Sequence, residues 1–184
     1  MATKKAKKGT VQFKIWAALR ILIGLIFLWA FMDKMFGLGY ATCRTVDMES
    51  KTESVNVLCE KSVAKGGSPT TGFLKFAAKG PLQDFYNDLA GNTVVDFLFM
   101  AGLLLIGLAL VLGIGVKVAA VSGIVLLMMM WSAVLPPENN PILDDHIVYS
   151  VVLLGILVTN GNQVWGLGKW WQSQDLVKKF PVLA

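Results

Sequence analysis

Several ionisable side chains stand at the edges of long apolar segments, where they could bind a polar group or pass protons. Asp33 and Lys34 end one apolar segment, Asp96 opens another, and His146 opens a third directly after Asp145. Ionisable residues at membrane depth are costly and are therefore functional suspects. Histidine is also the side chain that changes charge near neutral pH. We expect Asp33, Asp96 and His146, as candidate catalytic residues, to line one polar pocket in the outer leaflet.

The same residues also have a structural interpretation. Carboxylates at helix N-termini accept hydrogen bonds from free amides and favour the helix dipole, so Asp144 and Asp145 suit capping. Asp96 follows Val94 and Val95 and should already lie in the first turn of its helix, where capping explains less. A single histidine at a helix start is more often a hydrogen-bonded structural residue. Both interpretations stay open at the level of the sequence.

Arg20 is the one charge inside the first apolar segment. Its position near the inner leaflet allows the side chain to extend to lipid phosphate or to point into a helix bundle. At about 1.5 Å per residue, Arg20 and Lys34 lie roughly 21 Å apart along one helix. Arg20 is therefore not expected to belong to the outer group.

The composition limits which cofactors the chain can hold. One histidine and two cysteines cannot supply a bis-histidine haem, a three-histidine zinc site or a four-cysteine iron–sulfur cluster. The sequence also has no nucleotide-binding loop, G-x-S-x-G elbow or H-E-x-x-H motif. We expect no haem, metal or nucleotide, and any electron transfer must use a diffusible carrier or a partner protein.

Cys43 and Cys59 both fall in a long polar segment that we place outside the membrane. On the oxidising side a disulfide is the expected state, and closing a loop of this length stabilises the fold by about 3 kcal/mol in the chain-entropy model. A structural bridge is therefore favoured. The alternative is a thiol pair that passes electrons to quinone, as in the vitamin K epoxide reductase family. It is disfavoured because no span contains a second pair in C-x-x-C spacing.

The elements that must position these residues are membrane helices. A hydrophobic content of 55% and a mean hydropathy of +0.60 exceed the values of ordinary soluble domains. The runs Phe97 to Val116 and Val118 to Leu135 are separated only by Lys117, and each has the length of about 18 to 20 residues that a bilayer requires. With two further apolar segments, we predict an all-α, polytopic membrane protein with a four-transmembrane-helix bundle. The expected spans are about 13–36, 94–116, 118–135 and 143–160.

The formal net charge of +5 is concentrated at the chain ends and does not indicate a nucleic-acid partner. Lysines precede the first span and follow the last, and Lys117 lies between the second and third spans. By the positive-inside rule both termini are cytoplasmic. The first apolar run is longer than that of a signal peptide, so we expect an uncleaved anchor. The predicted location is the cell membrane, with the lipid bilayer as the first partner.

The rest of the chain divides around these spans. We expect residues 1–11 to form a basic, disordered cytoplasmic tail on anionic lipid. The membrane domain covers 12–163, including an outer loop at 37–92, and 164–184 form an interfacial C-terminal segment. Within the loop, Gly72 to Ala90 predict two short amphipathic helices on the outer face. Small residues at four-residue spacing, Ala109 with Gly113 and Ala119 with Gly123, predict a close approach of the second and third spans.

A family resemblance is carried by five stretches in a defined order. They are RILIGLIFLWAFMDKMFGL from Arg20, GGSPTTGFL from Gly66, AGNTVVDFLFMAGLLLIG from Ala90, LPPENNPILDDHIVYSVVLLG from Leu135 and GLGKWW from Gly166. Together they resemble the DoxX/DoxD family of small bacterial and archaeal membrane proteins, nearly from end to end. The segment from about Arg44 to Val63 looks like an insertion, so the resemblance does not bear on the disulfide.

The resemblance implies a four-helix membrane subunit, associated in the DoxD branch with thiosulfate oxidation coupled to quinone reduction. In other branches it implies a redox-linked partner of soluble enzymes that handle sulfur or oxidative stress. We expect a redox-associated subunit in which Asp96 and His146 handle protons. The polar positions that match the family are Arg20, Asp33, Lys34, Asp96, Asn140, Asp145 and His146, of which Arg20, Lys34, Asn140 and Asp145 are the candidates for binding quinone or an anion.

The alternative hypothesis is a non-catalytic scaffold that holds a partner enzyme or complex at the membrane through the outer loop. Two features favour this hypothesis: the long outer loop at 37–92 with its amphipathic segments, and the lack of a set of residues that could ligate a cofactor. A partner protein subunit and a homo-oligomer are both open. A small-solute transporter is a third option, but neither a broken helix nor an inverted repeat is evident in the sequence.

Overall fold

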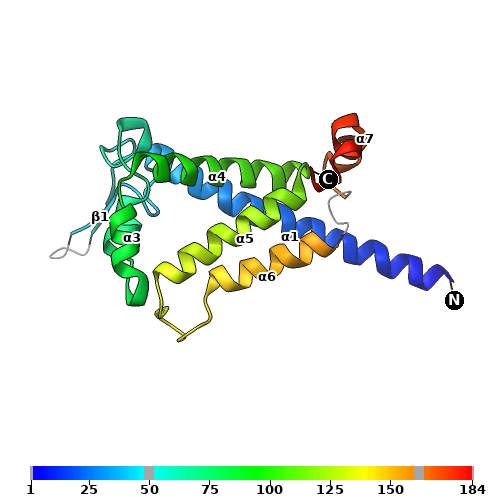
Figure 1. The fold of residues 1–184 in the computed structure, drawn as a ribbon, viewed down its shortest axis with the longest axis horizontal. Helices are drawn as coiled ribbons and strands as arrows, with labels where there is room; N and C mark the ends of the chain where they lie inside the picture. Colours follow the sequence, from blue (N-terminus) through cyan, green and yellow to red (C-terminus); the bar gives the residue numbers. More distant parts are fainter. Residues whose placement is uncertain (1, 48–51, 160–163, 184) are drawn as a thin grey trace.

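The protein is mostly helical in a computed structural model that describes residues 2–47, 52–159 and 164–183, with side chains from residue 11 onward. Figure 1 shows the long helices α1, α4, α5 and α6, an irregular cap at the end away from the chain termini, and short helices after α6. Three helical stretches are long and apolar enough to cross a membrane: Val11–Phe36, Thr93–Leu112 and Val116–Ala133. The structure therefore fits a membrane environment.

Helix α1 (Ala2–Phe36) begins nine residues earlier than its apolar span does. The basic segment at 2–10 therefore continues the first span as helix, and the expectation of a disordered tail is wrong. The helix ends where Gly37 adopts the left-handed conformation (φ 65°) and its amide bonds to the Asp33 carbonyl at 2.7 Å. Glycine takes this conformation at little steric cost.

Helices α4 (Thr93–Leu112) and α5 (Val116–Ala133) form a hairpin. The turn lies at Gly113 and Gly115, both with positive φ, and Lys117 is already inside α5. The charge that interrupts the apolar run predicts a turn at Lys117, and this prediction is wrong. The glycines decide the position, since the Gly113 amide closes α4 on the Ala109 carbonyl at 2.9 Å.

Helix α6 (Asp145–Val158) has 14 residues, which corresponds to about 21 Å. It is apolar but shorter than the other three long helices, and residues 160–163 after it lie outside the described part. Asp144 caps its N-terminus by accepting a hydrogen bond from the Ile147 amide at 3.3 Å. The capping interpretation of Asp144 is therefore confirmed.

The long helices pack as two pairs, α1 with α4 and α5 with α6. Figure 1 shows the pairs close together near the chain termini and separating toward the cap. Their contact forms one core that includes Ile23, Phe27, Leu110, Leu127 and Leu153. Many large apolar side chains on the outward faces are exposed, as expected where lipid covers a helix.

The predicted small-residue contacts are only partly correct. Gly113 serves as the α4 C-cap, so it is not a mid-helix packing position. Gly123 packs most closely on α6 and not on α4, because a Cβ there would lie 2.9 Å from Leu153 Cδ1 but 3.5 Å from Ile106 Cγ2 of α4, an ordinary contact.

The cap comprises residues 37–92 apart from the undescribed 48–51. A short antiparallel hairpin joins β1 (Arg44–Val46) to β2 (Glu53–Val55), with Thr45 opposite Ser54. The hairpin shows that the fold is not entirely α. Four short helices follow, η1 (Val63–Lys65), α2 (Thr71–Phe76), η2 (Gly80–Leu82) and α3 (Gln83–Leu89).

Hydrogen bonds from Tyr86 and Lys79 hold the cap on α5. The Tyr86 hydroxyl on α3 bonds to the Met129 carbonyl at 3.0 Å and to the Ser132 hydroxyl at 2.6 Å, both on α5. The Lys79 amide donates to the Ala133 carbonyl at 2.9 Å. Because Tyr86 is buried, it combines apolar contact with satisfied hydrogen bonding. Helix α3 therefore closes the space between the separating helix pairs.

The C-terminal segment lies at the opposite end from the cap (Figure 1). It contains α7 (Gly168–Ser173), α8 (Asp175–Lys179) and η4 (Pro181–Leu183). Lys117 on α5 donates to the Pro181 carbonyl at 3.1 Å, and Trp171 Nε1 donates to the Leu183 carbonyl at 2.5 Å. The segment therefore contacts the start of α5.

Candidate functional site

Arg20 points into the bundle and is fully buried. Its Nη1 donates to the Leu110 and Val111 carbonyls at the end of α4. Its Nη2 donates to the Val164 carbonyl at 3.1 Å and the Trp165 carbonyl at 3.0 Å. The last carbonyls of a helix have no intrahelical partner, and a cation there also favours the helix dipole. Of the two sequence interpretations, the structure selects the bundle interior, and Arg20 ties α1 to α4 and to the segment after α6.

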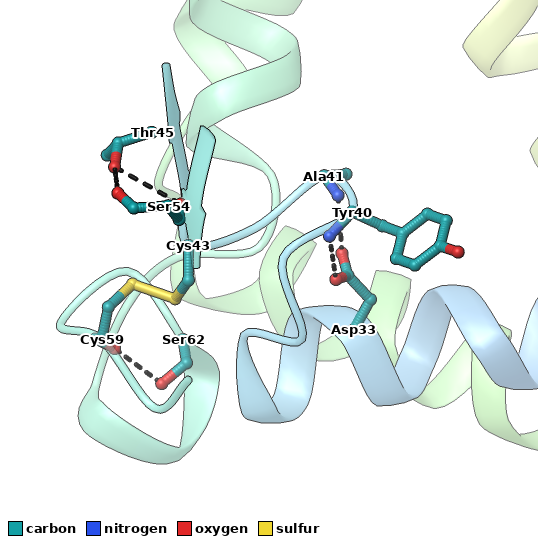
Figure 2. Close-up of a disulfide and its surroundings, with 8 residues drawn as sticks. All are labelled: Asp33, Tyr40, Ala41, Cys43, Thr45, Ser54, Cys59 and Ser62. Carbon is teal, nitrogen blue, oxygen red and sulfur yellow. Dashed lines mark hydrogen bonds between the residues drawn. A yellow bond between two sulfur atoms is a disulfide. The ribbon is translucent and has the colours of Figure 1, made fainter. Parts of the chain in front are cut away.

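Asp33 is also buried, with 2% of its surface exposed. One carboxylate oxygen accepts the Tyr40 amide and the other accepts the Ala41 amide, each at 3.0 Å. Figure 2 shows both bonds, which join the last turn of α1 to the loop that leads to Cys43. A charged acceptor with two amide donors is a strong arrangement. Asp33 therefore fixes where the cap begins.

Asp96 holds the turn that precedes α2. Its Oδ1 accepts the Ser68 hydroxyl at 2.9 Å and the Thr70 hydroxyl at 2.5 Å. Ser68 Oγ in turn accepts the Thr71 amide at 3.1 Å. The capping of α4 falls to Asn92, whose side chain accepts the Val94 and Val95 amides. Asp96 thus links the start of α4 to the cap.

His146 lies beside two carboxylates at the start of α6. Its Nδ1 is 2.7 Å from Asp144 Oδ2 and 3.5 Å from Asp145 Oδ1. Asn140 closes the preceding loop by accepting the Ile142 and Leu143 amides at 2.9 and 2.8 Å. Asp144, Asp145 and His146 line a cavity of about 730 Å³ together with residues of the loop after α5. Their ligand atoms lie within 4.8 Å of one another, but exposed acidic groups commonly gather without a metal.

The structure does not bring Asp33, Asp96 and His146 into one pocket. Each has separate hydrogen-bond partners, and the cavity at His146 is lined by neither aspartate. The expectation of a shared polar pocket fails because the cap supplies the loop amides and hydroxyls that the aspartates bind. Catalytic roles for these residues stay predictions.

Two other cavities adjoin each other where the cap meets α1, α4 and α5. One has a volume of about 620 Å³ and a mostly apolar wall that also contains charged residues, among them Lys34 and Lys61, and Cys43; we call it the polar cavity by contrast with its neighbour. The other is apolar, has a volume of about 270 Å³ and lies between α2, α3, α4 and α5, with Leu98 and Met129 in its wall. Both are lined by Pro69, Phe73, Phe99 and Met130. Together they offer a polar chamber that adjoins an apolar one.

Charge in the polar cavity is mainly positive. Its ionisable lining residues are Lys34, Arg44 and Lys61 against the single carboxylate of Glu60. Arg44 is engaged in an exposed ion pair with Glu53, and Lys34 Nζ lies 5.8 Å from the centre of the Phe99 ring. A cavity with this lining attracts anions or carbonyl oxygens. Of the candidate catalytic and quinone-binding residues from the sequence, only Lys34 lies in its wall, together with the disulfide candidate Cys43.

Sequence reasoning missed the residues that join the two cavities. Phe73 was recognised only as part of an amphipathic pattern, and Phe99 and Met130 only as parts of membrane spans. The available signal was the GGSPTTGFL stretch, which contains Pro69 and Phe73.

Comparisons of the chain with protein-family models, with curated proteins and with solved structures find no match.

Proposed function

We propose that this chain is a redox-associated integral membrane subunit of the DoxX/DoxD type that binds a quinone. In this proposal α6 is a fourth span, both termini are cytoplasmic and the cap faces outward. The electron donor is thiosulfate or another reduced sulfur anion. The resemblance suggests the reaction class, and the geometry of the cavities supports the choice of site.

One observation carries the proposal: the apolar and polar cavities share Pro69, Phe73, Phe99 and Met130. A quinone is a polar ring with an apolar tail, and binding sites of this kind are mostly apolar with a few placed polar groups. Phe99 and Phe73 offer faces for the ring. The polar cavity offers Lys34 as a donor to a quinone oxygen.

The sulfur anion would enter the polar cavity from the outer surface. The cations Lys34 and Lys61 in its wall favour a small anion by charge. When bound, the quinone supplies the two-electron acceptor, and the chain contributes an apolar chamber, a positive charge and a route from the surface. Asp33 and Asp96 support the cap from outside this site.

Quinone binding to the purified protein tests the proposal. We expect Lys34→Met to weaken binding of a soluble quinone analogue about tenfold, the value of one lost charge-assisted hydrogen bond. His146→Gln is the matched control, because His146 lines the separate cavity at α6, and we expect it to bind like the wild type. Equal affinity in wild type and Lys34→Met, or no binding in the wild type, contradicts the proposed site. Thiosulfate-dependent quinone reduction in the same samples tests the reaction.

The second candidate is the non-catalytic scaffold. It is favoured by the bonds that commit Asp33 and Asp96 to the cap and by exposed apolar residues on the cap, including Phe76 at 80% exposure. Affinity purification in mild detergent separates the two candidates. A stoichiometric partner without bound quinone supports the scaffold, and a protein that carries quinone without a partner supports the redox subunit.

A further inference from the structure

The structure joins Cys43 to Cys59 by a disulfide, as the sequence predicts (Figure 2). Cys43 is 7% exposed and lies in the wall of the polar cavity, together with Lys34 and Arg44. The same cavity adjoins the apolar chamber through Phe73 and Phe99. Cys43 therefore lines a cavity that adjoins an apolar one, a relationship that a purely structural bridge does not require.

The backbone beside both cysteines is strained. Cys43 has φ 66° and Leu58, which precedes Cys59, has φ 60°. A residue with a Cβ loses roughly 1 to 2 kcal/mol in this left-handed conformation. Such positions persist only where the surrounding structure fixes them, and they cluster at functional sites. Here the Asn56 amide bonds to the Cys43 carbonyl at 3.1 Å and the Leu58 amide bonds to the Phe36 carbonyl at 2.9 Å.

Hydrogen bonds hold the two cysteines near each other independently of the sulfur–sulfur bond. The β1–β2 hairpin starts directly after Cys43. The Cys59 carbonyl accepts the Ser62 amide at 2.9 Å and the Ser62 hydroxyl at 2.7 Å. Since Ser62 is fully buried, this anchor is shielded from water. Asn56 joins the two cysteines, since its amide bonds to the Cys43 carbonyl and its carbonyl accepts the Cys59 amide, each at 3.1 Å, and none of these bonds uses a sulfur atom.

We propose that Cys43 and Cys59 form a redox couple that exchanges two electrons with the quinone in the adjoining cavity; this inference rests on the proposed quinone binding. The two thiols lose two electrons and two protons as the sulfur–sulfur bond forms. The two quinone oxygens take up those electrons and protons, and the product is a quinol. Cations favour the thiolate that starts this exchange, and Lys34 and Arg44 lie in the same wall.

The missing C-x-x-C pair disfavours a thiol couple at the level of the sequence, but the place of Cys43 in the structure answers that objection. A second pair is needed where electrons pass from one thiol pair to another before they reach the quinone. Here Cys43 itself lines the polar cavity that adjoins the apolar one, so one pair is sufficient, with Cys59 as the thiol that closes the bridge.

The test uses the full-length protein in detergent, reduced and then freed of reductant without oxygen. A quinone analogue with every ring carbon substituted is added, because it cannot form a stable thiol adduct. We expect mass spectrometry after thiol labelling to show loss of both free thiols, while the absorbance shows one quinol formed per chain. At a quinone concentration that saturates both proteins, which removes the weaker binding of Lys34→Met, this variant should still slow the exchange about tenfold, because a smaller fraction of its thiols is ionised.

A variant with Cys43→Ser and Cys59→Ser is the matched control. We expect it to bind the quinone and to form no quinol. If reduced wild-type protein binds quinone but keeps both thiols, or if reduction abolishes quinone binding, the exchange is refuted while the quinone site of the oxidised protein stands. If the oxidised wild type binds no quinone, both proposals fall.

Discussion

Gly24 of α1 and Gly107 of α4 pack backbone to backbone: a Cβ added to either residue would lie 3.0 Å from the carbonyl oxygen of the other. This reciprocal contact sets the distance between the two helices. Arg20 lies one turn before Gly24, and the carbonyls that it binds lie one turn after Gly107. The close approach therefore lets the guanidinium reach the end of α4.

Gly107→Ala should destabilise the protein. The new Cβ would lie 2.7 Å from Leu28 Cγ and 3.0 Å from the Gly24 carbonyl oxygen, and overpacking of this kind costs about 1 to 3 kcal/mol. Thermal unfolding in detergent measures the effect. Gly102→Ala in the same helix is the control, since its Cβ meets only Leu126 Cδ2 at 3.8 Å. An equal melting temperature for both variants contradicts the contact.

Arg20→Met should lower stability more than Arg20→Lys. The methionine leaves the bonded carbonyls at the end of α4 and in the 164–165 segment without donors, and each unsatisfied buried group costs about 1 to 3 kcal/mol. Lysine keeps one charge but cannot span both sets of carbonyls. We expect the melting temperature to be highest for the wild type, lower for Arg20→Lys and lowest for Arg20→Met. If Met melts with the wild type, Arg20 has no structural role.

Asp33→Asn should loosen the start of the cap. The amide nitrogen of asparagine cannot accept a hydrogen bond, so either Tyr40 or Ala41 loses its partner at a cost of about 1 to 3 kcal/mol. Hydrogen exchange at these two amides should accelerate, while exchange in α4 stays unchanged. Asp84→Asn, at an exposed position in α3, serves as the control. Unchanged protection at both amides contradicts the role of Asp33.

Asp96→Ala should be more harmful than Asp96→Asn. Asparagine retains an oxygen that can accept from Ser68 and Thr70, whereas alanine removes the acceptor from both hydroxyls. The lost bonds to a charged acceptor correspond to about 1.5 to 3 kcal/mol each. Limited proteolysis within residues 66–72 and thermal melts report the difference. A proton-relay role for Asp96 instead predicts that Asn abolishes turnover while stability is retained.

The membrane helices could be predicted because length and composition alone decide them, as the run Phe97 to Val116 shows. The sequence predicts the turn at Lys117, where a charge interrupts the apolar run, and this position is wrong. The backbone freedom of Gly113 and Gly115 decided it instead. The lysine-rich composition of residues 2–10 predicts exposure to water, but it does not exclude helix. Once the first span has formed as helix, adding residues to its end is easier than starting a new helix, and α1 begins at Ala2.

The candidate site was less predictable, for a physical reason. A carboxylate at the edge of a span can meet another ionisable group or a loop amide, and the sequence does not distinguish these partners. Asp33 binds Tyr40 and Ala41, which lie close to it in the sequence. Asp96 binds Ser68 and Thr70, which lie far from it in the sequence. Phe99 and Met130 line the cavities with side chains that resemble any apolar core residue.

Photoaffinity labelling tests most directly whether the two adjoining cavities hold a quinone. A photoreactive quinone analogue is activated on the purified protein, and the labelled residues are mapped by mass spectrometry. We predict labelling at Phe73, Phe99 or Met130, reduced by excess unlabelled quinone and by Lys34→Met. Labelling spread over the lipid-facing sides of the helices, or concentrated at residues 144–146, would contradict the account.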